Sequence, residues 1–469
     1  MRFVVCSFVI AALLLAPHAG RAQVGTGECN VIESSPTSIT HIIGGGEVVY
    51  ISGGARFTCR DGRTIRSDSV ARYRSSGITE FHRNVRYEDE DNILTAGYVR
   101  YMEQQRQAIA QTNVRLTDRA TASVITAPYM NYYEATDDRP ESRVEIPSGR
   151  PHAVLVSVSK ADSTQRDTTE VDADAMDILG RGSFSGRGNV VLVRADLTGT
   201  GGFSLYSRDD GDLQLWQNAR LETADYTLSS DTIHGRTNDA DELEQVTAIG
   251  TAVLDASDVD VNAPRIVVFL EEGEVARLVA VGEKGAPDEP LDVTRQAVAL
   301  SEDFRMTADS IDALAPAQSL KQVHAIGRAW AERLNADIAD ANVPSIASRD
   351  WMKGDTIVAT FIEVPDTGVV APVLAADSVA PADTTRTRRE VETVLALGGT
   401  GDGRAASLNR VQDEDDPQAP VAINYLVARR ILVHLKGGEV DTVEPSGEVQ
   451  GIYLDPIRRP AQASGGRSR

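Results

Sequence analysis

Apolar and polar side chains alternate along many short stretches of the chain. A period of two places successive side chains on opposite faces of a β-strand, so one face of each stretch is apolar. These stretches are rich in Val, Ile, Thr and Tyr and too short for helices. The pattern predicts an all-β protein of antiparallel strands. The clearest apolar faces carry Val114 and Leu116, Val190 and Leu192, Ile266, Val268 and Leu270, and Ile431, Val433 and Leu435.

One strand pattern occurs three times in the first third of the chain. Each copy begins with a small or acidic residue and ends in a tyrosine, and these tyrosines are 28 and 31 residues apart. An Asn-Val step lies between copies, at Asn84 and Asn113, and recurs at Asn189. A unit of this size cannot bury its apolar face alone, so we expect the copies to stack as repeated strand pairs. The three copies are 67–73, 95–101 and 126–132.

A second pattern of eight residues recurs later, with apolar residues at its first, fourth and sixth positions in the clearest copies and a glycine at its end. A glycine in a strand suits a bulge or a tight turn, so each copy predicts a strand that bends there. An Asp-Ser/Thr-Ile step precedes several copies. The glycines are Gly250, Gly282, Gly327, Gly398 and Gly447, and the aspartates are Asp231, Asp309 and Asp355.

Three stretches depart from the strand pattern. Residues 325–341 predict the one helix, because Trp330, Leu334 and Ile338 recur every four residues. Residues 23–40 are rich in Gly, Ser, Thr and Pro and predict a loose lead-in. Residues 364–389, rich in Pro, Ala, Thr and Asp, predict a mobile surface loop.

The chain start predicts export, and the length predicts several domains. One early positive charge, a short apolar run and small residues up to Ala22 are typical of a cleaved signal peptide, so we expect a periplasmic protein. The remaining 447 residues (469 minus 22) exceed one ordinary domain. A polar turn cluster at 136–150 is the first candidate boundary. The expected division is a signal peptide at 1–22, β domains at 23–148, 149–290 and 291–457, and a disordered tail at 458–469.

Charge is distributed unevenly along the chain. The formal net charge is −22, and such an acidic surface repels nucleic acid. Residues 55–120 nevertheless hold 12 Arg against 9 Asp plus Glu, a local balance of +3. Ordinary solvated charges on strand faces explain such an excess as well. An anionic ligand would therefore find its best electrostatic attraction in the first repeats.

The cysteines and candidate metal ligands are few. Cys29 and Cys59 are predicted to form a disulfide in an oxidising compartment, with two unpaired thiols as the alternative. The seven histidines show no ligand spacing. Two aspartate groups and a Gly-rich turn have oxygens that suit calcium, but they fit solvent-facing strand positions equally well. These are Asp172, Asp174 and Asp177, then Asp255, Asp258 and Asp260, and the turn 398–402. We therefore predict no metal and no cofactor.

No catalytic motif is present. A nucleophile elbow and a phosphate-binding loop are both missing from the sequence. Carboxylate pairs for glycoside hydrolysis stay open, because 69 Asp and Glu side chains have no visible pairing in the sequence. The prediction is a protein that is not an enzyme.

The apolar strand faces allow two interpretations. They fill an ordinary sandwich core, or two sheets splay apart and leave an apolar trough for acyl chains. The candidate lipid-binding residues are Val85, Val114, Leu116, Val190, Leu192, Ile266 and Val268. Arginines near the rim are candidate contacts for phosphate groups. They are Arg72, Arg86, Arg100 and Arg115.

The repeats resemble those of the OstA-like, or LptA, family of lipopolysaccharide transport proteins. The resemblance is clearest over residues 45–135, with weaker copies at 171–282 and 305–456, and the Gly-Asn-Val step is intact at Gly188. It implies tandem twisted antiparallel β-jelly-roll segments, an apolar interior that carries lipopolysaccharide acyl chains, and stacking through strand edges with like proteins, including a possible homo-oligomer. The chain departs from small family members in its length, its acidity and the 364–389 insertion.

The predicted function is a periplasmic carrier or bridge for lipopolysaccharide in outer-membrane assembly. The first alternative is an envelope scaffold that pairs through its strand edges without binding lipid. The second is a β-helical enzyme acting on polysaccharide, which the aromatic content of 5% disfavours, since glycan grooves are commonly lined by aromatic rings.

Overall fold

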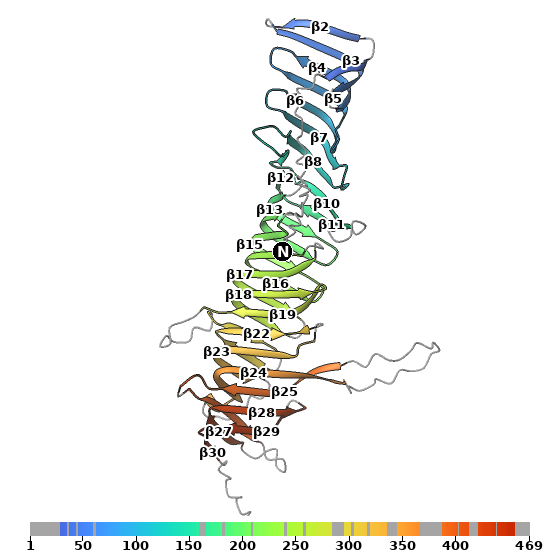
Figure 1. Ribbon diagram of the computed structural model, residues 1–469. Helices are drawn as coiled ribbons and strands as arrows, with labels where there is room; N and C mark the ends of the chain where they lie inside the picture. The colour runs from blue at the N-terminus through green and yellow to red at the C-terminus, as the bar shows by residue number, and fades with distance from the viewer. Residues whose placement is uncertain are drawn as a thin grey trace, which may run out of the picture.

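The computed structural model is a column of antiparallel strands stacked in chain order, from β2 at one end to β30 at the other (Figure 1). It describes residues 29–34, 37–43, 46–59, 62–158, 166–180, 183–207, 210–238, 242–256, 259–283, 295–301, 304–316, 319–334, 345–365, 387–401, 403–411, 421–437 and 439–454. The 30 strands that these residues form belong to one sheet, which confirms the all-β prediction. Within these residues, none of the helices has the length and apolarity needed to cross a membrane.

Long strands form most of the column, and each pairs with the strands before and after it. They are β3 (Gly46–Cys59), β4 (Thr64–Tyr73), β5 (Ile78–Glu88), β6 (Asn92–Met102), β7 (Gln107–Asp118), β8 (Val124–Tyr133), β13 (Ser183–Val193), β14 (Thr198–Ser207), β15 (Asp212–Glu222), β16 (Tyr226–Thr237), β17 (Leu243–Ala256), β18 (Asp260–Glu271), β23 (Gln322–Arg333) and β24 (Trp351–Pro365).

Elsewhere two short strands take the place of one long strand. At six levels of the described ladder both members of the pair bond to the same neighbouring long strand, as β9 and β10 do with β8. The pairs are β1 (Cys29–Ser34) and β2 (Thr37–Ile43), β9 (Arg143–Ile146) and β10 (His152–Val158), β11 (Arg166–Asp172) and β12 (Ala175–Leu179), β19 (Glu274–Val281) and β20 (Ala297–Leu300), β21 (Phe304–Ala308) and β22 (Ser310–Leu314), β25 (Thr387–Leu397) and β26 (Ala405–Val411), β27 (Ala422–Ala428) and β28 (Arg430–Lys436), and β29 (Glu439–Ser446) and β30 (Gln450–Leu454).

The repeated sequence motifs form a corner at which each long strand bends. In alternate strands two successive residues have positive φ, such as Arg83 (63°) with Asn84 (49°), and the register shifts there. Asparagine tolerates this left-handed conformation better than most residues, which explains the recurring Asn-Val step. The neighbouring strand supplies a small residue and an aspartate: Asn84 Nδ2 donates to Asp68 Oδ2 at 3.0 Å, and Asn189 Nδ2 donates to Asp174 Oδ2 at 2.8 Å.

The bend predicted at the second motif is confirmed at Gly250 and Gly327. Both glycines have positive φ, 109° and 78°, and lie at register shifts. A Cβ added to Gly250 would stand 2.3 Å from Asp231 Oδ2, and one added to Gly327 would stand 2.5 Å from Asp309 Oδ2. The Asp-Ser/Thr-Ile step and the closing glycine are therefore the two sides of one corner.

The bends divide the column into two arms that face each other. We call the half-strands that carry Ile51, Val70 and Phe81 the Phe81 arm, and those that carry Phe57, Ile65 and Tyr87 the Phe57 arm. The Phe57 and Phe81 rings touch edge to face across the interior, with centroids 5.8 Å apart. Buried apolar residues of both arms form one core that runs from the first long strands into β28.

Two predictions of local structure are wrong. Residues 325–333 are not helical but lie in β23, which pairs with β22 and β24, because Gly327 and Arg328 form a corner and tertiary pairing overrides the four-residue spacing. Ile338 lies outside the described residues. The expected loose lead-in at 23–40 contains β1 and the first part of β2, both paired with β3.

The segment between β24 and β25 is also shorter than the loop predicted at 364–389. β24 extends to Pro365 and β25 begins at Thr387, and the residues between lie outside the described part of the chain. The predicted signal peptide and tail lie outside it as well.

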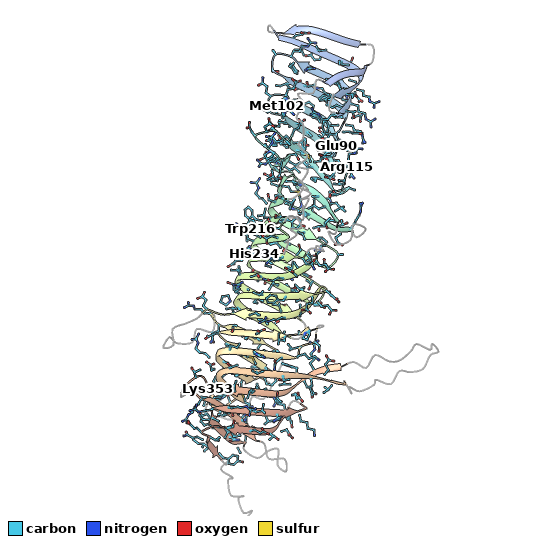
Figure 2. All side chains as sticks on the ribbon, in the orientation of Figure 1. Glu90, Met102, Arg115, Trp216, His234 and Lys353 are labelled. Atoms are coloured by element: carbon cyan, nitrogen blue, oxygen red, sulfur yellow. The ribbon has the colours of Figure 1, made fainter. Side chains whose placement is uncertain are left out.

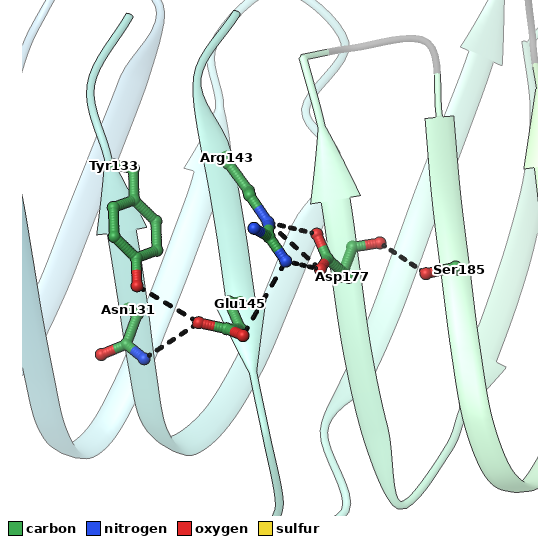
Figure 3. A network of polar contacts seen from close by, with 6 residues as sticks. All are labelled: Asn131, Tyr133, Arg143, Glu145, Asp177 and Ser185. Atoms are coloured by element: carbon green, nitrogen blue, oxygen red, sulfur yellow. Dashed lines mark hydrogen bonds and ion pairs between the residues drawn. The ribbon is translucent and has the colours of Figure 1, made fainter. Parts of the chain in front are cut away.

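Strand pairing continues through the expected boundary at 136–150. On the outer face Glu145 accepts hydrogen bonds from Tyr133 Oη (3.2 Å) and Asn131 Nδ2 (3.4 Å), and Arg143 binds Asp177 of β12 (Figure 3). These contacts join β8, β9 and β12. The ladder has no break at this point, and the division into three domains stays a prediction.

Candidate functional site

The seven residues predicted to contact lipid all point into the interior between the arms. Each is buried: Val85 (2%), Val114 (1%), Leu116 (6%), Val190 (1%), Leu192 (6%), Ile266 (0%) and Val268 (0%). They are spread from β5 to β18, so they do not form one compact site. Two of the seven, Leu116 and Leu192, line a cavity in the interior.

This cavity lies between the two arms at mid-column. Its volume is about 190 Å³, and its lining comes from strands between β6 and β17. A dry cavity of about 150 Å³ lined by apolar side chains is already large enough to bind a small apolar molecule. The apolar lining is Leu116, Ile125, Tyr132, Val144, Leu155, Val156, Val171, Ile178, Phe184, Leu192, Leu197, Tyr206, Leu213 and Leu243.

Small polar side chains lie at the ends of the arms, and their small volume leaves room for the cavity. Ser142, Ser157, Thr169 and Ser183 line it at the ends of β9 to β13.

The first repeats are closed between the arm ends by a charged contact. Arg63, in the turn between β3 and β4, donates to Glu134 Oε1 at 2.6 Å, and Arg106 approaches Glu134 Oε2 at 3.4 Å. Burial raises the pKa of the Tyr87 and Tyr132 hydroxyls well above the usual range, so both stay neutral. This contact lies at the arm ends of the first repeats, whose strands β6 to β8 also supply part of the cavity lining.

One ion pair stands at the cavity rim. Arg194 Nε donates to Asp196 Oδ1 at 2.6 Å, and the Arg194 side chain is 18% exposed. Burial alone would raise the pKa of the Asp196 carboxyl, but the hydrogen bonds and charge of Arg194 outweigh it and hold the pKa below its usual value. The rim therefore carries a neutralised pair beside an apolar interior.

The four arginines predicted to contact phosphate are not brought together. Arg86 and Arg115 lie on the outer face of the Phe57 arm. Arg72 and Arg100 lie on the other arm and bind carboxylates, Glu103 at 3.0 Å and Glu80 at 2.7 Å. Two further arginines that the prediction missed, Arg56 and Arg66, share the outer row with Arg86. Only the strand register, which the sequence does not reveal, would have identified them.

Cys59 is disulfide-bonded, and Cys29 stands directly opposite it in the pairing of β1 with β3. Among the described residues, no group of three or more His, Cys, Asp or Glu is placed to hold a metal ion.

No protein-family model matches the chain, and the curated proteins give no match either. A function for this chain therefore has to be inferred from its geometry and its repeats.

Proposed function

We propose that the protein carries an acylated glycolipid, with lipopolysaccharide as the first candidate, and shelters the acyl chains between its two arms. The observation that supports this most directly is the apolar cavity of about 190 Å³ at mid-column. The resemblance of the repeats to the OstA-like proteins supports the same class of ligand, and the signal-like first 22 residues support a periplasmic setting. The proposal includes no catalytic step.

Binding would come from the burial of acyl chain. Each CH₂ group removed from water contributes about 0.8 kcal/mol, so a few methylenes in the cavity already give useful affinity. The cavity ends at the arm tips, where its lining includes serines, threonines and Arg194, which pairs with Asp196. A ligand with apolar chains and a polar head matches this gradient from apolar wall to polar rim.

The first test asks whether the protein holds lipid. Native mass spectrometry of the protein purified from its own cellular compartment, followed by organic extraction, should show a near-stoichiometric acylated glycolipid. Leu155→Trp, which places an indole in the cavity, should remove most of that lipid while the thermal midpoint is retained. Leu155 is half-buried and lines the cavity, so the larger ring has space to enter.

Leu205→Trp is the matched control, because Leu205 is 38% exposed and does not line the cavity. It should leave the lipid load unchanged. A wild-type protein that stays free of lipid after incubation with lipopolysaccharide would refute the proposal, and so would equal loads in the two variants.

A scaffold function is the second candidate, and the C-terminal edge of the column favours it. Among the described strands β30 pairs with β27 alone, and Ile452 (57%), Tyr453 (58%) and Leu454 (55%) are exposed there. An exposed apolar edge strand is a template for pairing with another strand. Ile452→Lys should abolish assembly in light scattering if this edge pairs, whereas Leu205→Lys should not. Assembly without any bound lipid would favour the scaffold over the carrier.

A further inference from the structure

Four arginines lie in one row across the outer face of the Phe57 arm. Arg56, Arg66 and Arg86 stand directly opposite one another on β3, β4 and β5. The row continues through Thr95 on β6 to Arg115 on β7, which lies in the N-terminal part of the column (Figure 2). Since adjacent strands are about 4.8 Å apart, the row from Arg56 to Arg115 is about 19 Å long. We call this set the arginine row.

The arginine row lies along an open groove. The groove has a volume of about 1030 Å³, and three arginines of the row line it together with Asn84, Asn113 and Thr95. Amide and hydroxyl groups of such residues add hydrogen-bond donors beside the guanidinium groups. The groove thus combines positive charge with neutral donors over several strands.

Two carboxylates also line the groove, and both already have partners. Asp68 accepts a hydrogen bond from Asn84 at 3.0 Å. Glu88 binds Arg86, and this hydrogen bond, aided by the nearby charges of Arg66 and Arg119, holds the pKa of Glu88 below its usual value. Glu88 thus offsets the charge of one arginine, whereas Asp68 keeps its charge beside a neutral amide, and the three arginines that line the groove still outnumber its two carboxylates.

The row itself is electrostatically unfavourable without a ligand. Like charges directly opposite each other on paired strands destabilise a sheet. Glu33 stands opposite Arg56 at the outer end of the row, but no carboxylate of the described residues forms an ion pair with Arg66 or Arg115. A chain with a net charge of −22 has many carboxylates to spare, so the lack of an ion pair at Arg66 and Arg115 indicates a place for an anion.

We propose that the arginine row binds a ligand with clustered phosphate groups. Guanidinium groups offer paired N–H donors that match phosphate oxygens, and successive arginines on paired strands present such forks side by side. The site is separate from the interior cavity, because no residue that lines the groove also lines the cavity. The proposal therefore does not depend on lipid in the interior.

The test uses inorganic tripolyphosphate as the probe and the full mature chain as the protein. Isothermal titration at low salt should show saturable binding that weakens as salt rises. The double variant Arg66→Gln with Arg115→Gln should bind at least about tenfold more weakly, since each lost charged hydrogen bond is a sizeable loss. The thermal midpoint of the wild-type protein should rise with tripolyphosphate, and that of the double variant should not.

A matched control removes the same number of charges elsewhere. Arg220→Gln with Arg265→Gln takes two exposed arginines from β15 and β18, outside the groove. This control should keep the wild-type affinity. Equal weakening in both double variants would mean general charge attraction and would overturn the proposal, as would unchanged binding in the Arg66 and Arg115 variant.

A second arm identifies the source of the phosphate groups. Vesicles containing phosphatidic acid should bind, and tripolyphosphate should displace them, if the ligand is a phosphorylated headgroup. Tripolyphosphate binding without any binding to these vesicles assigns the site to a free phosphate ligand. Failure of both probes to bind overturns the proposal, whatever the lipid content of the interior.

Discussion

The first repeats (β3 to β8) and the later strands (β13 to β24) use the same bent strand but differ on their outer faces. The row that carries Arg56, Arg66, Arg86 and Arg115 in the first repeats continues in the later strands without a run of like charge. Its later members are Val191, Thr200, Arg220, Ser229, Val253, Asn262, Val298, Thr307, Trp330 and Lys353. The difference teaches that the interior and the corner determine the fold, while the outer face is free to carry a binding surface.

Substitutions of the corner glycines are expected to have the largest effect on folding stability. Gly54 in the first repeats and Gly250 in the later strands have almost the same φ, 110° and 109°. A Cβ added at Gly54 would have no atom within 4 Å, whereas a Cβ added at Gly250 would stand 2.3 Å from Asp231 Oδ2. Gly54→Ala should destabilise by about 1–2 kcal/mol, from backbone strain alone. Gly250→Ala should destabilise by about 2–5 kcal/mol, because overpacking against the aspartate adds to that strain.

Urea unfolding of the two alanine variants checks this difference. Equal losses of stability would show that the carboxylate moves aside freely. The corner aspartates would then have no role in fixing the bend.

An intermediate effect is expected from an ion pair of the first repeats. Burial alone would raise the pKa of Glu80, but hydrogen bonds from Arg100 and Tyr98 outweigh it and lower the pKa below the ordinary 4.5. The stabilisation is therefore fully present at neutral pH and is lost as pH falls through the folded-state pKa. Glu80→Gln should destabilise by about 1 kcal/mol at pH 7, and the difference should vanish in acid below both pKa values.

The later strands supply the control for this pair. Glu222 lies 3.4 Å from Arg220, and both side chains are more than half exposed. Glu222→Gln should change stability by less than about 0.5 kcal/mol at any pH. A pH-independent loss in Glu80→Gln, measured by urea unfolding at several pH values, would contradict the assignment.

The smallest expected effect concerns the arginine row without its ligand. Arg66→Gln removes the charge between two other arginines, so it should stabilise the protein by about 0.2–1 kcal/mol. Arg265→Gln, between Ile249 and Val281 on the later strands, should have no such effect. Denaturant midpoints at low salt, without added phosphate, test both variants, and a loss of stability in Arg66→Gln would mean that the row is not repulsive.

The sequence predicted the strands and their bends well, because both depend on local signals. Alternation identified the buried faces of β7, β13 and β18, and a closing glycine located the bends at Gly250 and Gly327. The same local reasoning failed at Trp330, where a helix-like spacing lies in a strand paired on both sides.

Pairing across strands was the part that sequence reasoning could not supply. Arg56 and Arg66 share a row with Arg86 only through register, and Ser157 lines a cavity together with residues from strands far away in the sequence, such as Leu243. The pattern of residues along the sequence reveals neither the shared arginine row nor the shared cavity lining. The candidate residues Arg72 and Arg100 were chosen by sequence position and belong to ion pairs on the other arm.

The pairing of each strand with close neighbours in the chain also shapes how the column forms. Among the described strands, none pairs with another more than three places away in chain order. Every strand pairing in such a ladder joins close neighbours in chain order, so any few adjacent strands can begin to fold without waiting for the rest of the chain. The column can therefore grow from its first strands onward as the polypeptide becomes available, and adding or removing a pair of bent strands changes its length without altering the layers on either side.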